Sequence, residues 1–180
     1  MATEQELLQL LKEPSTQGKG FRILVNAYNE RVYWTIRRMV MNHDDADDVT
    51  QLVFIKIFEN INSFRQDSKL FTWIYRIAIN ETLTFLAQKR RRNIISWDTI
   101  EHKMSESLIE DAYFEGDEIQ LQLQKAVLLL PEKQRLVFNM KYYEELKYEE
   151  MEEILGTSVG ALKASYHHAV KKIEEFLNSR

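Results

Sequence analysis

The sequence predicts an all-α protein made of two small helical domains that an acidic linker joins. Apolar residues recur at steps of three and four along most of the chain, which is the period of a helix with one buried face. Glycine and proline are scarce, at 5 and 2 of 180 residues. A β-sandwich or barrel of this length would need more turn residues, and a Rossmann or P-loop fold would need a glycine-rich phosphate loop that is absent here.

Charge divides the chain into three parts. Residues 1–95 contain 14 Lys and Arg residues and 11 Asp and Glu residues. Residues 96–118 contain 1 basic and 8 acidic residues, and residues 119–180 contain 9 of each kind. The acidic stretch therefore predicts a linker at 96–118 between domains at 1–95 and 119–180, with a surface loop of a single domain as the alternative. The absence of Cys excludes disulfides and thiolate metal sites. No membrane span or signal peptide is visible, and so we expect a cytoplasmic protein.

The first domain is predicted to be a bundle of about four helices. A short helix is expected around Glu4 to Lys12, and a longer one over 21–41. Asp44 or Asp45 is expected to cap a third helix that runs to about Phe58. A fourth helix begins near Phe71 and ends in the basic run 89–92, where cations also complement the helix dipole.

The second domain has the pattern of a helix-turn-helix. Residues 119–130 and a segment from Pro131 to about residue 143 predict two helices. A short helix over 147–155 ends at Gly156, and Ser158 is expected to cap a final helix that runs to about Asn178. A short helix, a turn containing glycine and a longer helix are typical of a helix-turn-helix.

The final helix has two different faces. At 100° per residue, one face collects apolar side chains from Val159 to Leu177. The other face holds small residues and cations, and a recognition helix in the major groove needs this combination. Its centre comprises Gly160, Lys163, Ala164, His167 and Lys171, with Ser165, His168 and Lys172 at the margins. A solvated basic face on a packing helix is the simpler alternative.

Four motifs, in order, resemble those of bacterial RNA polymerase sigma factors. Residues 46–51 (ADDVTQ), followed by Phe54, resemble region 2.2 of that family. Phe64 and Arg65, together with 71–80 (FTWIYRIAIN), look like regions 2.3 and 2.4 of its extracytoplasmic-function (ECF) group. Residues 130–138 look like the start of region 4, and 148–163 resemble its helix-turn-helix. The resemblance covers roughly 21–92 and 119–178 and includes the two-domain layout.

The resemblance implies a transcription initiation factor that is not an enzyme and needs no cofactor. Such proteins bind core RNA polymerase at its β′ clamp and β flap, and direct it to promoter DNA. Asp48 and Gln51, with Asp47 beside them, match the positions that dock on the clamp. Leu52 stands where a Glu is common, and so this contact is expected to be partly apolar. An anti-sigma factor is a further expected partner, whereas a small-molecule substrate and membrane insertion are not expected.

The resemblance also assigns DNA contacts to both domains. The first domain would read and open the −10 element, with the loop 64–69 capturing an unstacked base. Trp73 is expected to support this loop or to stack on a base, and the basic run would hold phosphates. The −10 candidates are Phe64, Arg65, Lys69, Trp73, Arg76, Asn80, Lys89, Arg90, Arg91 and Arg92. The −35 candidates on the final helix are Gly160, Lys163, Ala164, Ser165, His167, His168 and Lys171.

Three other functional hypotheses are compatible with the sequence. A helix-turn-helix regulator that binds operator DNA without polymerase would explain the second domain but leave Asp48 and Gln51 unexplained. A helical adaptor without DNA binding is another possibility. A Mg²⁺-dependent hydrolase could use Asp44, Asp45, Asp47 and Asp48 as ligands, but further ligands at fixed spacing are lacking.

Overall fold

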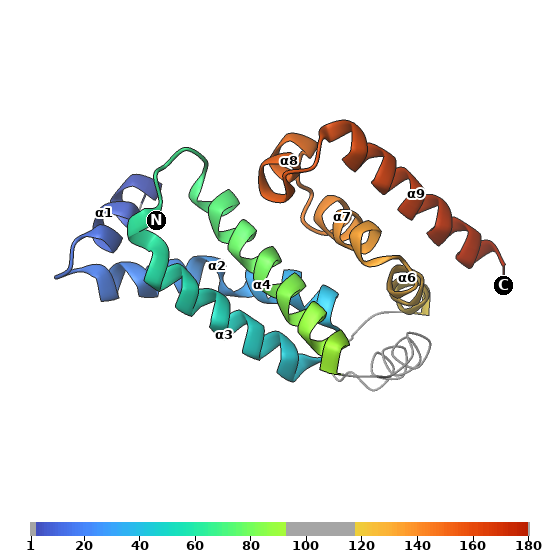
Figure 1. Ribbon diagram of the computed structural model, residues 1–180, viewed down its shortest axis with the longest axis horizontal. Coiled ribbons are helices and arrows are strands. Elements are labelled where there is room, and N and C mark those ends of the chain that lie inside the picture. Colours follow the sequence, from blue (N-terminus) through green and yellow to red (C-terminus); the bar gives the residue numbers. More distant parts are fainter. Residues whose placement is uncertain (1–2, 93–117, 180) are drawn as a thin grey trace. The chain divides into compact units, whose positions relative to one another are not determined.

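The computed structural model describes residues 3–92 and 118–179, and every regular element within them is helical. The chain divides into two compact units, Met1–Ala87 and Gln88–Arg180 (Figure 1). The all-α prediction is therefore confirmed. The predicted linker falls outside the described residues except at its last position, and the predicted domain boundaries stay predictions. None of the described helices is both long and apolar enough to cross a membrane.

The first unit begins with α1 (Glu4–Lys12) and α2 (Gln17–Val40), which pack against each other. In a reciprocal cap on α1, the Glu6 N–H donates to Thr3 Oγ1 at 3.2 Å and the Thr3 N–H donates to Glu6 Oε2 at 2.8 Å. The two helices approach closely at Gly20, where a Cβ atom would lie 2.9 Å from the backbone of Leu10 and Leu11. Only glycine fits this crossing without a shift of the backbone.

α2 is followed by α3 (His43–Asn60) across a tight junction. Met41 adopts a left-handed conformation, with φ of 65°, and ends α2. The N-cap of α3 is Asn42, whose Oδ1 accepts from the Asp45 N–H at 2.9 Å. The predicted cap at Asp44 or Asp45 is therefore wrong. Both carboxylates instead lie in the first turn, where negative charge favours the helix dipole.

The core of the first unit includes α4 (Leu70–Arg92), which follows α3 after a short 3₁₀ turn, η1 (Ile61–Ser63). Ile36 of α2, Ile57 of α3 and Ile74 of α4 are fully buried. The hydroxyls of Tyr75 and Thr35 lie 3.0 Å apart and join α4 to α2. Lys56 Nζ lies 2.6 Å from Glu81 Oε1 and joins α3 to α4. These contacts fix the outward faces of α3 and α4 on one scaffold.

The second unit contains α6 (Glu118–Leu128), α7 (Glu132–Tyr142), α8 (Tyr148–Leu155) and α9 (Val159–Asn178). α9 packs against the three other helices. Its core joins side chains of α6, α7 and α9 around a loop leucine: Ala126, Val127, Leu130, Phe138, Ala169 and Ile173. The helix-turn-helix prediction for α8 and α9 is confirmed by this geometry.

The turn between α8 and α9 is fixed at both ends. Gly156 ends α8 in the left-handed region, at φ of 63°, and its N–H donates to Glu152 O at 2.8 Å. Ser158 is the N-cap of α9, as predicted, and its Oγ accepts from the Ala161 N–H at 3.4 Å. The Glu152 carboxylate accepts from the Val159 N–H at 3.1 Å and so satisfies a second free donor of α9.

Candidate functional site

The outward face of α3 brings together the three residues predicted to contact polymerase. Asp48 and Gln51 are exposed, and Asp47 is half-exposed. Asp47 Oδ2 lies 3.4 Å from His43 Nε2, and the other ring nitrogen of His43 lies 2.7 Å from the Tyr33 hydroxyl. The structure thus places all three polar side chains toward solvent on adjacent turns of one helix.

Large apolar side chains continue the same face of α3. Leu52, Ile55 and Phe58 expose 42%, 54% and 42% of their surface. Exposed apolar clusters next to polar residues mark interaction sites more often than isolated apolar residues do. Sequence reasoning missed Ile55 and Phe58, although they follow Gln51 at steps of four and three residues. We call the set Asp47, Asp48, Gln51, Leu52, Ile55 and Phe58 the α3 outer face.

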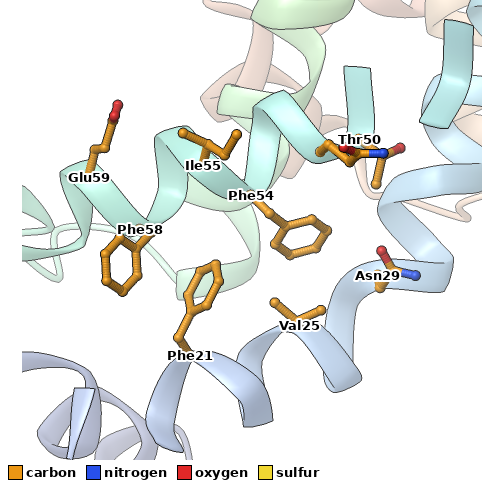
Figure 2. Close-up of a pocket in the computed structure, with 9 residues that line it drawn as sticks. Phe21, Val25, Asn29, Thr50, Phe54, Ile55, Phe58 and Glu59 are labelled. Carbon is orange, nitrogen blue, oxygen red and sulfur yellow. The ribbon is translucent and has the colours of Figure 1, made fainter. Parts of the chain in front are cut away.

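A pocket of about 770 Å³ opens beside this face, between α2 and α3. Figure 2 shows Phe21 and Val25 of α2 pointing toward Phe54 and Phe58 of α3. The Phe21 ring meets Phe58 edge-on, with centroids 5.0 Å apart. Thr50 Oγ1 is buried in the pocket lining and has no hydrogen-bond partner in the described part of the chain. Gln51 also lines the pocket, and so the apolar hollow is continuous with the α3 outer face.

The loop 64–69 joins η1 to α4. Phe64 is buried, with 4% exposed, and its ring centroid lies 5.3 Å from that of Trp73. Arg65 and Lys69 are exposed, and Gln66 adopts a φ of 64°. The half-buried Trp73 ring therefore supports the loop through Phe64. Of the two aromatic candidates, neither stands fully open to a base in this conformation.

α4 carries the remaining −10 candidates. Arg76 and Asn80 are both exposed and lie four residues apart, and so they share one face of the helix. Lys89, Arg90 and Arg91 are exposed near its C-terminal end, and Arg92 is its last residue. A polar face thus leads from Arg76 toward a cationic helix end.

The second unit exposes nearly all of its −35 candidates on α9. Leu162, Ala169 and Ile173 are buried, and so the apolar face of α9 meets the core. A Cβ atom at Gly160 would meet no atom within 4 Å, which means that this glycine is not needed for packing. Ser165 is half-buried, and the exposed candidates are Gly160, Lys163, Ala164, His167, His168 and Lys171.

The ring of Tyr148, the first residue of α8, lies near two cations. The Lys141 and Lys163 ammonium groups lie 5.1 Å and 5.7 Å from its ring centroid. Burial raises the pKa of the Tyr148 hydroxyl above its ordinary value. The ring helps to direct Lys163 on the exposed side of α9. The contact between Tyr148 and Lys163 joins residues 15 positions apart across a turn, and no local sequence pattern predicts it.

The four aspartates at the start of α3 do not gather as a metal site. No group of three His, Cys, Asp or Glu side chains within 3–92 and 118–179 converges in a way that could hold an ion. Asp47 faces His43, as described, while Asp44 and Asp48 are exposed.

Comparisons with known proteins agree with this arrangement. The family model for sigma-70 region 2 matches residues 24–92, and that for sigma-70 region 4 matches residues 120–173. The first match includes α3, the loop 64–69 and α4, and the second includes the helix-turn-helix. Together they include every residue predicted to contact polymerase or DNA.

Relatives match over nearly the whole chain. The chain is 33% identical to the ECF RNA polymerase sigma-E factor of Escherichia coli K12, over 96% of this chain and 95% of that protein. It is 30% identical to the ECF RNA polymerase sigma factor SigW of Bacillus subtilis, over 88% of this chain and 89% of that protein.

Solved structures share the fold at lower identity. CnrH, solved in complex with the cytosolic domain of CnrY, gives a TM-score of 0.71 at 17% identity, over 98% of this chain and 97% of that chain. Bartonella quintana RpoE, solved with the anti-sigma factor NepR, gives a TM-score of 0.69 at 20% identity, over 89% of this chain and 98% of that chain. Both conserved regions, in order, and the identity to curated relatives place this chain in the ECF family of RNA polymerase sigma factors.

Proposed function

We propose that this chain binds core RNA polymerase and directs it to promoters that it recognises at the −10 and −35 elements. The matches to sigma-70 regions 2 and 4, in that order, are the observation that carries the proposal. A regulator that binds operator DNA alone would need only the second unit. The region 2 match therefore favours a factor that acts with polymerase.

The α3 outer face is the proposed contact with the β′ clamp. An apolar centre at Ile55 and Phe58, bordered by Asp48 and Gln51, has the composition of a protein interface. Leu52 adds apolar surface where the family often has a Glu. We infer that the clamp contact combines hydrogen bonds to the polar residues with burial of the exposed apolar side chains.

We propose that the loop 64–69 and α4 recognise the −10 element. Extruding a base costs a few kcal/mol of stacking energy, and a preformed pocket edge offsets that cost. Arg65 and Lys69 are exposed on the loop, and Arg76 and Asn80 are exposed on α4. Phe64 acts from within the core by fixing the loop. The basic end of α4 contributes a salt-dependent attraction to phosphates.

We propose that the exposed face of α9 recognises the −35 element. Gly160 faces open space, which lets the backbone approach a groove closely. Lys163 and Lys171 can reach phosphates or base edges, and His167 and His168 can donate or accept hydrogen bonds. The β flap is the proposed polymerase contact of the second unit.

The remaining assignments come from family membership. A sigma factor works where polymerase works, and so we place the chain in the cytoplasm. Its role is binding rather than catalysis, and it uses no cofactor. An anti-sigma factor is the proposed antagonist, in line with the structural relatives solved in complex with a partner.

Transcription with purified core polymerase and a library of promoter fragments tests the proposal. The chain should confer start sites that core polymerase alone lacks. The double variant Asp48→Ala, Gln51→Ala should bind core at least about tenfold more weakly, because two polar contacts at an interface are lost. Glu30→Ala, which removes an exposed charge from α2, serves as the control. Unchanged core affinity in a folded double variant would remove the clamp assignment.

A further inference from the structure

α1 touches both ends of the loop 64–69. It packs against η1, which immediately precedes the loop. It also reaches the first residue after the loop, because the Leu70 N–H donates to Glu4 Oε1 at 3.1 Å. In Figure 1, α1 lies beside the turn that joins α3 to α4. α1 lies outside the matched region 24–92, and no sequence motif assigns it a function.

The Glu4 carboxylate acts as a cap that α4 lacks in its own sequence. The first turn of α4 contains no acidic residue, and the ammonium group of Lys69, which precedes the helix, can only donate hydrogen bonds. Free N–H groups at a helix N-terminus are stabilised by an acceptor and by negative charge. Glu4 provides both from a helix 66 positions away in the chain.

The carboxylate is held in place by two features of α1. The reciprocal cap between Thr3 and Glu6 fixes the first turn of the helix, to which Glu4 belongs. The close approach of α1 to Gly20 fixes its other end on α2. Burial raises the pKa of Tyr28 on α2, and the nearby Glu4 charge raises it further while Arg31 lowers it. Glu4 thus lies where α1, α2 and the start of α4 meet.

We propose that Glu4 is a positioning residue for the −10 base-capturing loop: α1 fixes the loop at η1, and the Glu4 carboxylate fixes its other end at Leu70. The inference rests on the proposed function of the loop 64–69. Arg65 and Lys69 then present their side chains from a loop that is anchored on both sides. Without Glu4, the start of α4 frays and the loop samples conformations that do not capture the base.

The experiment measures base capture by holoenzyme on a pre-melted promoter. Each non-template nucleotide of the −10 bubble is replaced in turn by an abasic site. The capture ratio is the affinity for the intact bubble divided by the affinity for the bubble with an abasic site at the most sensitive position. Glu4→Ala should reduce this ratio about fivefold, the factor expected for one lost helix-capping acceptor. Its affinity for core polymerase and for −35 duplex DNA should stay at the wild-type value, since neither proposed contact includes Glu4.

Glu13→Ala is the matched control, because it removes another exposed carboxylate, that of the C-cap residue at the other end of α1. Its capture ratio should equal that of the wild type. A wild-type ratio in Glu4→Ala, or an equal loss in Glu13→Ala, overturns the role of Glu4. If wild-type holoenzyme itself shows no sensitive position, the assignment of the loop fails instead, and so the two failures are distinguishable.

Discussion

Ile55 and Ile57 of α3 are identical residues with opposite environments, and replacing each with alanine separates binding from folding. Ile55 exposes 54% of its surface, whereas Ile57 exposes none. We predict that Ile55→Ala weakens binding to core polymerase without changing stability, and that Ile57→Ala lowers stability.

The magnitudes follow from the burial of the two side chains. Full burial of an isoleucine side chain is worth about 1.5–3 kcal/mol, and roughly half of that remains for Ile55 to gain at an interface. Since alanine keeps the β-carbon, Ile55→Ala should cost about 1 kcal/mol of binding, or about a fivefold loss of affinity. Its free energy of unfolding should stay within about 0.5 kcal/mol of the wild type. Ile57→Ala should lose about 2–5 kcal/mol of folding stability, because it leaves a cavity in the core.

Competition between each variant and a fluorescent wild-type chain for core polymerase gives the affinities, and urea denaturation gives the stabilities. If Ile55→Ala binds core as tightly as the wild type, the apolar part of the α3 outer face does not contact polymerase. A large loss of stability in Ile55→Ala would show that this side chain is packed rather than available to a partner.

Further variants test the second unit and the crossing of α1 with α2. Lys163→Ala should impair transcription from promoters that depend on the −35 element and reduce the slope of log affinity against log salt concentration by about 1; a change in stability alone would make Lys163 structural. Gly20→Ala should lower the free energy of unfolding by about 1–3 kcal/mol, because its Cβ would lie 2.9 Å from backbone atoms. Gly160→Ala, whose Cβ would meet open space, should leave stability unchanged or slightly higher and weaken only −35 binding; equal effects of the two glycine variants in urea denaturation would contradict this contrast.

The helices were predictable because local rules determine them. The apolar period gives each buried face, and Gly156 and Ser158 carry the turn chemistry of the helix-turn-helix in their own side chains. The cap of α3 was misassigned because Asn42, Asp44 and Asp45 are all good N-cap residues. The choice among these three residues depends on where α2 ends. It ends at Met41 in a left-handed conformation, which an apolar side chain such as that of methionine does not predict.

Contacts between distant segments could not be predicted in the same way. The exposure of Asp48 and Gln51 follows from position on one helix, but the pocket beside them needs Phe21 of α2 opposite Phe58 of α3. The cap from Glu4 to Leu70 likewise depends on how α1 folds over the bundle. One sequence carries no covariation to reveal such pairs, and so the contacts shared between helices were missed.

The distribution of charge predicts that the chain binds DNA weakly without a partner. Its formal net charge is −4, and Asp47 and Asp48 lie on the face proposed for polymerase rather than on those proposed for DNA. Attraction between a protein and DNA phosphates grows with the number of cations that meet them, and an overall negative charge opposes approach. We therefore expect the cations of α9 and of the end of α4 to give only weak DNA binding on their own. We propose that core polymerase, by binding the α3 outer face, holds both proposed DNA-binding faces at one promoter.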